Sequence, residues 1–217
     1  SAVKIFDKRK ADELIILDIG KRFNSKINML LVKEISKHCF MPLSFGGGIR
    51  SLKNAYSFFE NGADKIVCNS IFYSNKKLLQ KIIKTFGSQA VIFSLDYMYD
   101  KKSDNFFCVR DNKILNKDPI KIAKEAEKLG VGEILFHDID NDGKMNGYNY
   151  KILDKLSKSV NINTIALGGC GNKSDFYKLN KTTLSAYAAS SIFFWIGEST
   201  ISIKEYLNKK KVNIRQI

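Results

Sequence analysis

Four aspartates stand at the ends of short apolar runs in this 217-residue chain, where strands of a parallel sheet would end. These residues are Asp18, Asp96, Asp138 and Asp140. A carboxylate at the end of a rigid strand can act as a general acid or base on a substrate. It can equally cap the helix that follows, and for any one of the four taken alone we favour that structural role. Other residues are needed before one of them is assigned to catalysis.

Two glycine-rich turns form a second set of candidate residues, and each follows an apolar run. They are Gly46-Gly47-Gly48 and Gly168-Gly169-Cys170-Gly171. Glycine lets backbone N–H groups approach a phosphate closely. The next runs end in Asn69-Ser70 and in Ala189-Ser190-Ser191, which add hydroxyl and N–H donors. The alternative is that the glycines only form tight turns. Because the whole set occurs twice, we predict two equivalent phosphate sites for a ligand with a phosphate at each end.

Short β-branched runs alternate with longer amphipathic stretches along the whole chain, which predicts a parallel α/β sheet. The predicted strands cover 13–19, 42–47, 65–70, 90–97, 133–139, 163–169 and 186–193. The predicted helices cover 27–39, 51–62, 75–87, 119–130 and 150–160. The stretch 108–119 is expected to be a loop. With two prolines and no Ser/Gly-rich linker, we expect one domain over residues 1–217.

An internal repeat relates the two halves of the chain at an offset of 120 residues. Residues 12–19 correspond to 132–139, and Asn69-Ser70 corresponds to Ala189-Ser190. Repeated strand–helix units predict a (β/α)8 barrel built of two half-barrels. Seven strands can be counted, and the chain opens in a helical pattern. The counterpart of Asp96 would fall about 24 residues before Ser1, so we predict that the first strand lies upstream of this chain.

Three charged residues begin apolar runs, at the opposite ends of the predicted strands. They are Glu13, Lys65 and Glu133. Charges that enter a barrel from below need partners, and a ring of alternating sign would supply them. From spacing alone, however, solvated strand starts are the favoured interpretation.

Composition excludes several classes of protein. The chain is 44% apolar, so it is not disordered, and no run approaches the roughly 18 residues of a membrane span. The net charge is +14, but only 5 of the 36 basic residues are arginine and the lysines are dispersed. This favours a solvated surface or an anionic substrate over a nucleic-acid site. Four separated cysteines and two histidines argue against a zinc site or disulfides, so a reducing cytoplasm is expected.

From Ala2 to Arg215 the sequence resembles the cyclase subunit of imidazole glycerol phosphate synthase. The most specific segments are DELIILDI (12–19), MPLSFGGGIRS (41–51), GADKIVCNS (62–70), FGSQAVIFSLD (86–96), GVGEILFHDIDNDGKMNGY (130–148), ALGGCG (166–171) and IKEYLNKKKVNIR (203–215). The resemblance implies a (β/α)8 barrel that forms a heterodimer with a glutaminase at the barrel bottom. It also implies a lyase that joins ammonia to a phosphoribulosyl-formimino aminoimidazole carboxamide ribonucleotide, giving imidazole glycerol phosphate. No cofactor or metal is implied.

The resemblance also implies roles for individual residues. Asp96 matches one of two catalytic aspartates, and the other belongs to the first strand, which this chain does not contain. Asp18 matches a residue near the ribulose. The implied phosphate contacts are Asn69 and Ser70 at one site and Asp142, Gly143, Gly169, Ala189 and Ser190 at the other, with the glycine turns adding Gly48 and Gly168. Glu13, Lys65 and Glu133 match the charged ring where ammonia enters.

Some residues depart from the family pattern. His137-Asp138 replaces small hydroxyl residues, Lys144 replaces a threonine, and 108–119 lacks a Thr-Gly pair. Three alternatives therefore stay open. One is a related branch that accompanies a sugar amidotransferase and makes acetamidino groups on surface sugars. Another is the sister isomerase of histidine biosynthesis, against which FGSQ and the tail argue. The third is a non-catalytic, glutaminase-activating scaffold, since a form without the first strand is expected to be inactive.

Overall fold

The computed structural model describes residues 2–18, 28–110 and 113–215. Three predicted segments extend beyond the described residues. They are the strand 13–19 at residue 19, the helix 27–39 at residue 27 and the loop 108–119 at residues 111–112. The chain forms two compact units. The first comprises residues 1–93 and 129–132, and the second comprises 94–128 and 133–217.

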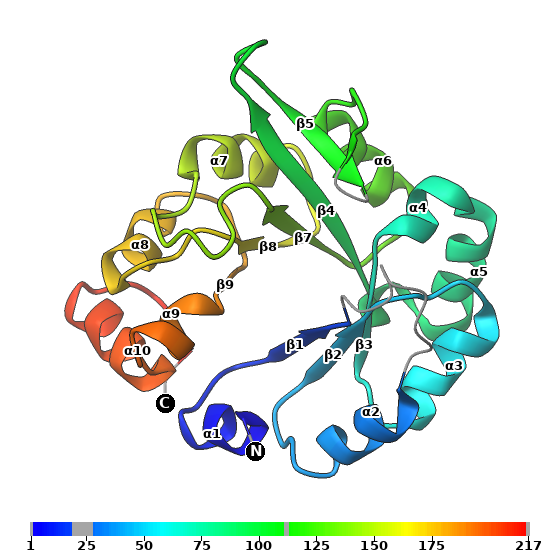
Figure 1. Cartoon of the computed structure of the whole chain (residues 1–217), viewed down its shortest axis with the longest axis horizontal. Coiled ribbons are helices and arrows are strands. Elements are labelled where there is room, and N and C mark those ends of the chain that lie inside the picture. Colours follow the sequence, from blue (N-terminus) through cyan, green and yellow to red (C-terminus); the bar gives the residue numbers. More distant parts are fainter. Residues whose placement is uncertain (1, 19–27, 111–112, 216–217) are drawn as a thin grey trace. The chain divides into compact units, whose positions relative to one another are not determined.

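The first unit is a parallel sheet with helices along one side (Figure 1). Its strands, in spatial order, are β1 (Leu14–Leu17), β2 (Leu43–Gly46), β3 (Lys65–Cys68) and the start of β4 (Val91–Asp100). Its helices are α1 (Ala2–Lys8), α2 (Met29–Ser36), α3 (Leu52–Glu60), α4 (Ser70–Ser74) and α5 (Lys76–Phe86), followed by the 3₁₀ turn η2 (Ser88–Ala90). Parallel pairing aligns Leu17 with Gly46, so β1 and β2 end together.

Capping residues and apolar burial explain these elements. The Ser51 side chain accepts a hydrogen bond from Asn54 N–H at the start of α3, and Asn75 does the same for Leu78 at the start of α5. Gly87 then ends α5 with a φ of +88°. The core contains fully buried side chains from the sheet and from the helices. These include Phe58, Ile66, Phe72, Leu79, Ile82, Val91 and Phe93.

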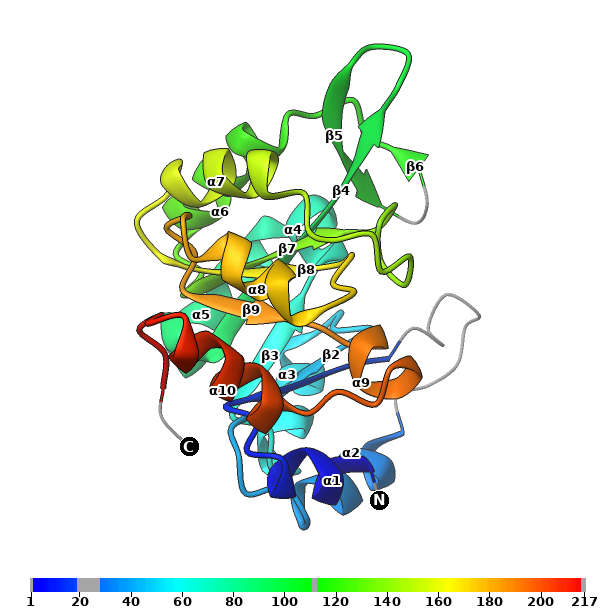
Figure 2. The same cartoon turned by 90° about the vertical axis from the view of Figure 1, so that its left-hand side faces the viewer.

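The second unit continues the same parallel pattern. Its parallel strands are the remainder of β4, β7 (Glu133–Asp138), β8 (Asn163–Leu167) and β9 (Ala186–Ala188), in that order. Its helices are α6 (Pro119–Leu129), α7 (Tyr150–Lys158), α8 (Lys173–Leu179), α9 (Ser191–Trp195) and α10 (Thr200–Lys209). Helix α10 packs against α8, as Figure 2 shows. The Ile139 N–H donates to the Tyr97 carbonyl at 3.1 Å, which joins the chain after β7 to β4.

An antiparallel extension of β4 corrects two sequence predictions. Strand β4 runs on to Asp100 and pairs with β5 (Asn105–Arg110), which pairs in turn with β6 (Lys113–Ile114). This hairpin projects from the second unit in Figures 1 and 2. Asp96 therefore lies inside β4 and not at its end, and the stretch 108–119 is partly strand and not a loop. The cause is aromatic packing, since the buried Tyr97 contacts Phe106 across the hairpin.

The predicted fold class is confirmed. In the described part of the chain, the seven predicted runs form seven parallel strands and a helix opens the chain, so the fold is of the α/β (β/α)8-barrel class. Two predicted strands run too far. The run 65–70 is strand only as far as Cys68 and turns into α4 at Ser70, and the run 186–193 is strand only as far as Ala188 and turns into α9 at Ser191. A further strand upstream of Ser1 and a single domain over 1–217 stay predictions.

The internal repeat is visible in the backbone, with one change of register. Asn69 (φ −126°, ψ −79°) and Ser190 (φ −129°, ψ −65°) adopt the same conformation before a five-residue helix. The carbonyl of each accepts a hydrogen bond of 3.0 Å from the N–H three residues on. Asn69 thus corresponds to Ser190, and Ser70 to Ser191. The predicted match of Asn69-Ser70 with Ala189-Ser190 was one residue out.

Two glycines place the repeated turns against the preceding strands. Gly47 has a φ of +125°, and a Cβ there would lie 2.7 Å from the Asp18 carbonyl oxygen. Gly168 has a φ of +105°, and a Cβ would lie 2.5 Å from the Asp138 carbonyl oxygen. No side chain fits at either position without moving backbone. In both halves of the repeat, the glycine therefore allows the turn to lie close to the end of the preceding strand.

Replacing Gly168 with alanine should destabilise the protein markedly, because the methyl group meets a backbone oxygen at a positive φ. We expect a loss of about 3 kcal/mol or more in the free energy of unfolding, measured by urea denaturation. Gly143→Ala is the matched control, because Gly143 has a φ of +78° and nothing lies within 4 Å of its added Cβ. The control should lose only about 1 kcal/mol. Equal losses would show that the close approach at Gly168 does not matter.

Candidate active site in the second unit

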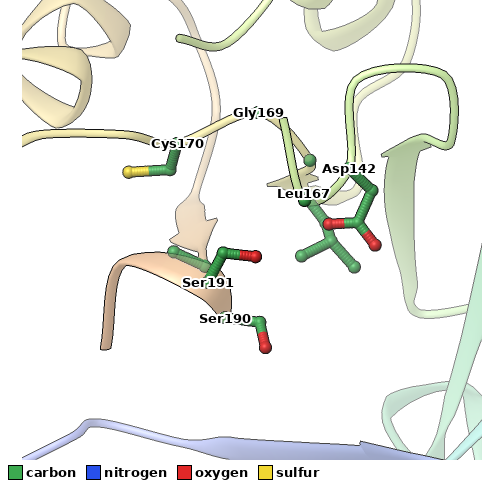
Figure 3. Close-up of a pocket in the computed structure, with 9 residues that line it drawn as sticks. Asp142, Leu167, Gly169, Cys170, Ser190 and Ser191 are labelled. Atoms are coloured by element: carbon green, nitrogen blue, oxygen red, sulfur yellow. The ribbon is translucent and has the colours of Figure 1, made fainter. Parts of the chain in front are cut away.

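A small pocket lies where three strands of the second unit end (Figure 3). Six residues predicted from the sequence to bind phosphate line it. They are Asp142, Gly143, Gly168, Gly169, Ala189 and Ser190. The structure adds Leu167, Cys170 and Ser191 to the lining. Figure 3 shows the Asp142 side chain on one side of the pocket and the serine side chains on another.

Hydrogen bonds fix the turn after β7 on the turn after β8. The Asn141 side-chain amide donates to the Gly147 carbonyl at 2.7 Å, and the Gly147 N–H donates to the Gly169 carbonyl at 2.7 Å. A Cβ on Gly169 would lie 2.4 Å from the Gly147 carbonyl oxygen. The Asp142 N–H donates to the Asp138 carbonyl at 2.9 Å. These bonds hold Asp142 at the mouth of the pocket.

A histidine links the predicted catalytic aspartate to this pocket. Nδ1 of His137 is 3.5 Å from Oδ1 of Asp96, and Nε2 is 3.3 Å from Oδ2 of Asp142. The side chains of His137 and Asp96 are only 15% and 17% exposed, whereas that of Asp142 is 45% exposed. The Ser94 hydroxyl donates to the same Asp96 oxygen at 2.8 Å. The Asp96 carboxylate is thus oriented by two partners.

Nearby charges and burial shift the pKa values of four groups at this site. Burial alone would lower the pKa of His137, but the carboxylates of Asp142 and Asp96 outweigh it and raise the pKa to about 9. The hydrogen bond from His137 lowers the pKa of Asp142. Burial raises the pKa of Asp138 to about 6. Burial likewise raises the pKa of the Cys170 thiol to about 12, so this thiol is protonated at neutral pH.

The remaining predicted substrate residues lie in the first unit, at the carboxyl ends of its strands. Asp18 directly follows β1, and its N–H donates to the Gly46 carbonyl at 2.8 Å. Gly48, with a φ of +58°, lies in the turn after β2. Asn69 and Ser70 form the turn between β3 and α4. Because these strands are parallel, the four residues share one edge of the unit's sheet.

Two of the three charged residues at the strand starts form an ion pair. Nζ of Lys65 is 3.0 Å from Oε2 of Glu13, and the Lys65 side chain is 18% exposed. This ion pair spans β2 at the amino ends of the first unit's strands. Glu133 is the first residue of β7 and belongs to the second unit.

His137 departs from the family pattern in the sequence, but its place in the site was not predicted. Its contacts depend on how side chains from β4 and the turn after β7 meet, and residue spacing does not encode this. Ser191 was named among the donors of its turn but not assigned a phosphate contact, because the repeat was aligned one residue out of register. Among the described residues, no group of three His, Cys, Asp or Glu side chains is arranged to hold a metal ion. No described helix is long and apolar enough to cross a membrane.

Comparisons with known proteins identify the family of this chain. A family model described as "Histidine biosynthesis protein" matches residues 1–198. The imidazole glycerol phosphate synthase subunit HisF of a Hydrogenobaculum species is 36% identical over 214 residues, which are 97% of this chain and 85% of that protein.

Two proteins named as putative imidazole glycerol phosphate synthase subunits hisF2 are also similar. The Pseudomonas aeruginosa protein is 32% identical over 217 residues, and the Campylobacter jejuni protein is 34% identical over 216 residues. Each match covers 99% of this chain and 86% of the relative. The chain therefore belongs to the histidine biosynthesis protein family, among its HisF-like members.

Proposed function

We propose that this chain is the synthase subunit that uses ammonia to convert a phosphoribulosyl-formimino aminoimidazole carboxamide ribonucleotide into imidazole glycerol phosphate. One observation carries the proposal. In the second unit, His137 contacts both Asp96, inside β4, and Asp142, one of the six pocket residues. These are the positions that match the family's acid–base and phosphate-binding residues. An acid–base group and an anion pocket are what ring closure of a phosphorylated substrate requires.

Asp96 is assigned the acid–base role. Its carboxylate is mostly buried and accepts a hydrogen bond from Ser94, so it has a defined orientation. A carboxylate held in this way can move a proton to or from the reacting nitrogen or carbon during cyclisation. The resemblance implies a second catalytic aspartate on another strand, and Asp96 would act together with it.

The substrate would carry two phosphates. One would bind in the pocket of the second unit, at Asp142, Gly143, Gly168, Gly169, Ala189 and Ser190. The other would bind in the first unit, at Gly48, Asn69 and Ser70, with Asp18 close to the ribulose. The matching backbone conformations of Asn69 and Ser190 support two equivalent sites.

Ammonia would come from a glutaminase subunit bound at the amino ends of the strands, in a heterodimer. Glu13, Lys65 and Glu133 begin three of these strands and are proposed as the gate for ammonia. The ion pair between Lys65 and Glu13 supports this, because a partly buried charge pair can be opened by a partner that competes for one member. All four cysteines are free thiols, which fits a cytoplasmic enzyme.

A second candidate is the related subunit that accompanies a sugar amidotransferase. His137 is the observation that favours it, because the pair His137-Asp138 departs from the pattern of the histidine enzyme. Both candidates use ammonia and differ in the acceptor. Turnover of an amidino-sugar precursor, without turnover of the ribonucleotide, would select the second candidate.

Asp96→Asn should reduce ammonia-dependent cyclisation by about 10²- to 10⁴-fold in the natural full-length protein, because asparagine cannot exchange a proton. The rate is followed as formation of imidazole glycerol phosphate at saturating ammonium. The matched control is Asp100→Asn on the same strand, where the carboxylate accepts hydrogen bonds from Ser103 in the exposed hairpin. The control should keep the normal rate. Normal turnover by Asp96→Asn would refute its catalytic role.

Crystals soaked in sulfate or phosphate should contain two bound anions, one beside Ser190 and one beside Asn69. The reason is that the two turns present the same backbone conformation. The check is anomalous or difference density at both turns from crystals grown at low salt. One anion only, or none at high occupancy, would contradict a doubly phosphorylated substrate.

A further inference from the structure

The ring of His137 lies between two carboxylates with different tasks in the proposed function. Nδ1 faces Asp96 at 3.5 Å and Nε2 faces Asp142 at 3.3 Å. A neutral imidazole has one N–H and one lone pair, so one of the two carboxylates would face a lone pair. Only the imidazolium can donate to both. The geometry therefore favours the protonated, positively charged form of the His137 imidazole.

The pocket beside Asp142 needs a neutralising charge if it is to hold phosphate. Among the nine described residues that line it, Asp142 is the one carboxylate and none is Lys, Arg or His. A phosphate monoester carries close to two negative charges at neutral pH, so a bare carboxylate in the pocket would repel it. Lys144, in the same turn as Asp142, pairs with Asp140 at 3.0 Å. The cation in contact with Asp142 is His137.

We propose that His137 is a positioning residue that, as an imidazolium, binds Asp96 and Asp142 at once, neutralising the phosphate pocket and holding the acid–base carboxylate in place. The part concerning Asp96 rests on the proposed function, whereas the part concerning phosphate rests on the pocket alone. Phosphate binding and the orientation of Asp96 are then coupled through one ring. A small hydroxyl residue at this position could not carry the charge.

The charges around His137 determine how this coupling depends on pH. Strand β4 contributes Asp96, the turn after β7 contributes Asp142, and Asp138 precedes that turn in β7. On the other side, the register of β8 sets Leu167 opposite His137. Burial disfavours the charge, yet the two contacting carboxylates hold the pKa of His137 at about 9. The ring is therefore charged below pH 9, and phosphate affinity should fall as the pH rises through that value.

An NMR titration of the imidazole signals tests the bridge without any substrate. The chain has two histidines, His38 and His137, so a His38→Gln variant assigns both signals. His137 should titrate near pH 9 in the unaltered protein. Asp142→Asn should lower its pKa by about one to three pH units, because an opposite charge at this distance shifts a pKa by that amount.

The matched control removes an equal charge two residues away. Asp140 pairs with Lys144 and not with His137, so Asp140→Asn should leave the titration of His137 nearly unchanged. A drop in the pKa with Asp142→Asn but not with Asp140→Asn would support the bridge. An ordinary pKa for His137 in the unaltered protein, or equal effects of the two variants, would overturn it.

Binding of inorganic phosphate at pH 7, measured by isothermal titration calorimetry, tests the neutralising role. His137→Asn should weaken phosphate binding by about tenfold or more, because Asp142 is left uncompensated. Adding Asp142→Asn to that variant should restore most of the affinity. A double variant that binds as weakly as His137→Asn alone would overturn this role. If His137→Asn does not fold, His137→Gln replaces it.

These measurements separate the inference from the proposed function. A protein without cyclase activity whose His137 titrates near pH 9 and responds to Asp142→Asn would contradict the proposed function alone. An active cyclase whose His137 has an ordinary pKa would contradict the inference alone.

Discussion

The close approach of two glycine backbones to the preceding strand ends is the constraint on which the binding turns depend. At Gly47 and Gly168 there is no room for a side chain, because the carbonyl oxygens of Asp18 and Asp138 occupy that space. The backbone of each turn is therefore packed directly against the end of the preceding strand. The turn after β8, placed in this way, meets the turn after β7 and forms the pocket with it.

Electrostatics then determines what this arrangement can bind. The second unit gathers Asp96, Asp138, Asp140 and Asp142 near one set of strand ends, which is an unfavourable concentration of like charge. The structure distributes that charge in three ways. Asp140 pairs with Lys144, Asp142 and Asp96 share His137, and burial raises the pKa of Asp138 to about 6. The cation beside Asp142 reduces the repulsion that this aspartate would exert on an anion in the pocket.

Much of the fold could be predicted from the sequence, because fully apolar strands and amphipathic helices leave distinct periods. The seven parallel strands and the opening helix were predicted for this reason. The hairpin of β4, β5 and β6 was not, because its length depends on pairing between side chains such as Tyr97 and Phe106 across a turn. The aromatic residues clustered in YMY (97–99) and NFF (105–107) were the available signal.

The candidate site was predicted in its residue types but not in its geometry. The glycine turns and Asp142 were found from the repeat and the family resemblance, and the structure gathers those of the second unit around one pocket. The one-residue change of register arises because the offset is 120 between Asp18 and Asp138 but 121 between Gly47 and Gly168. The bridge made by His137 depends on two side-chain distances and on burial, and these exist only once the strands are packed.

The central proposal is that this protein builds ammonia nitrogen into an imidazole ring. The most direct measurement supplies ¹⁵N-labelled ammonium with the phosphoribulosyl-formimino ribonucleotide and analyses the products by mass spectrometry. We expect imidazole glycerol phosphate that is heavier by one ¹⁵N, released together with unlabelled aminoimidazole carboxamide ribonucleotide. Unchanged substrate, under conditions in which a HisF subunit from a similar species converts it, would contradict the account.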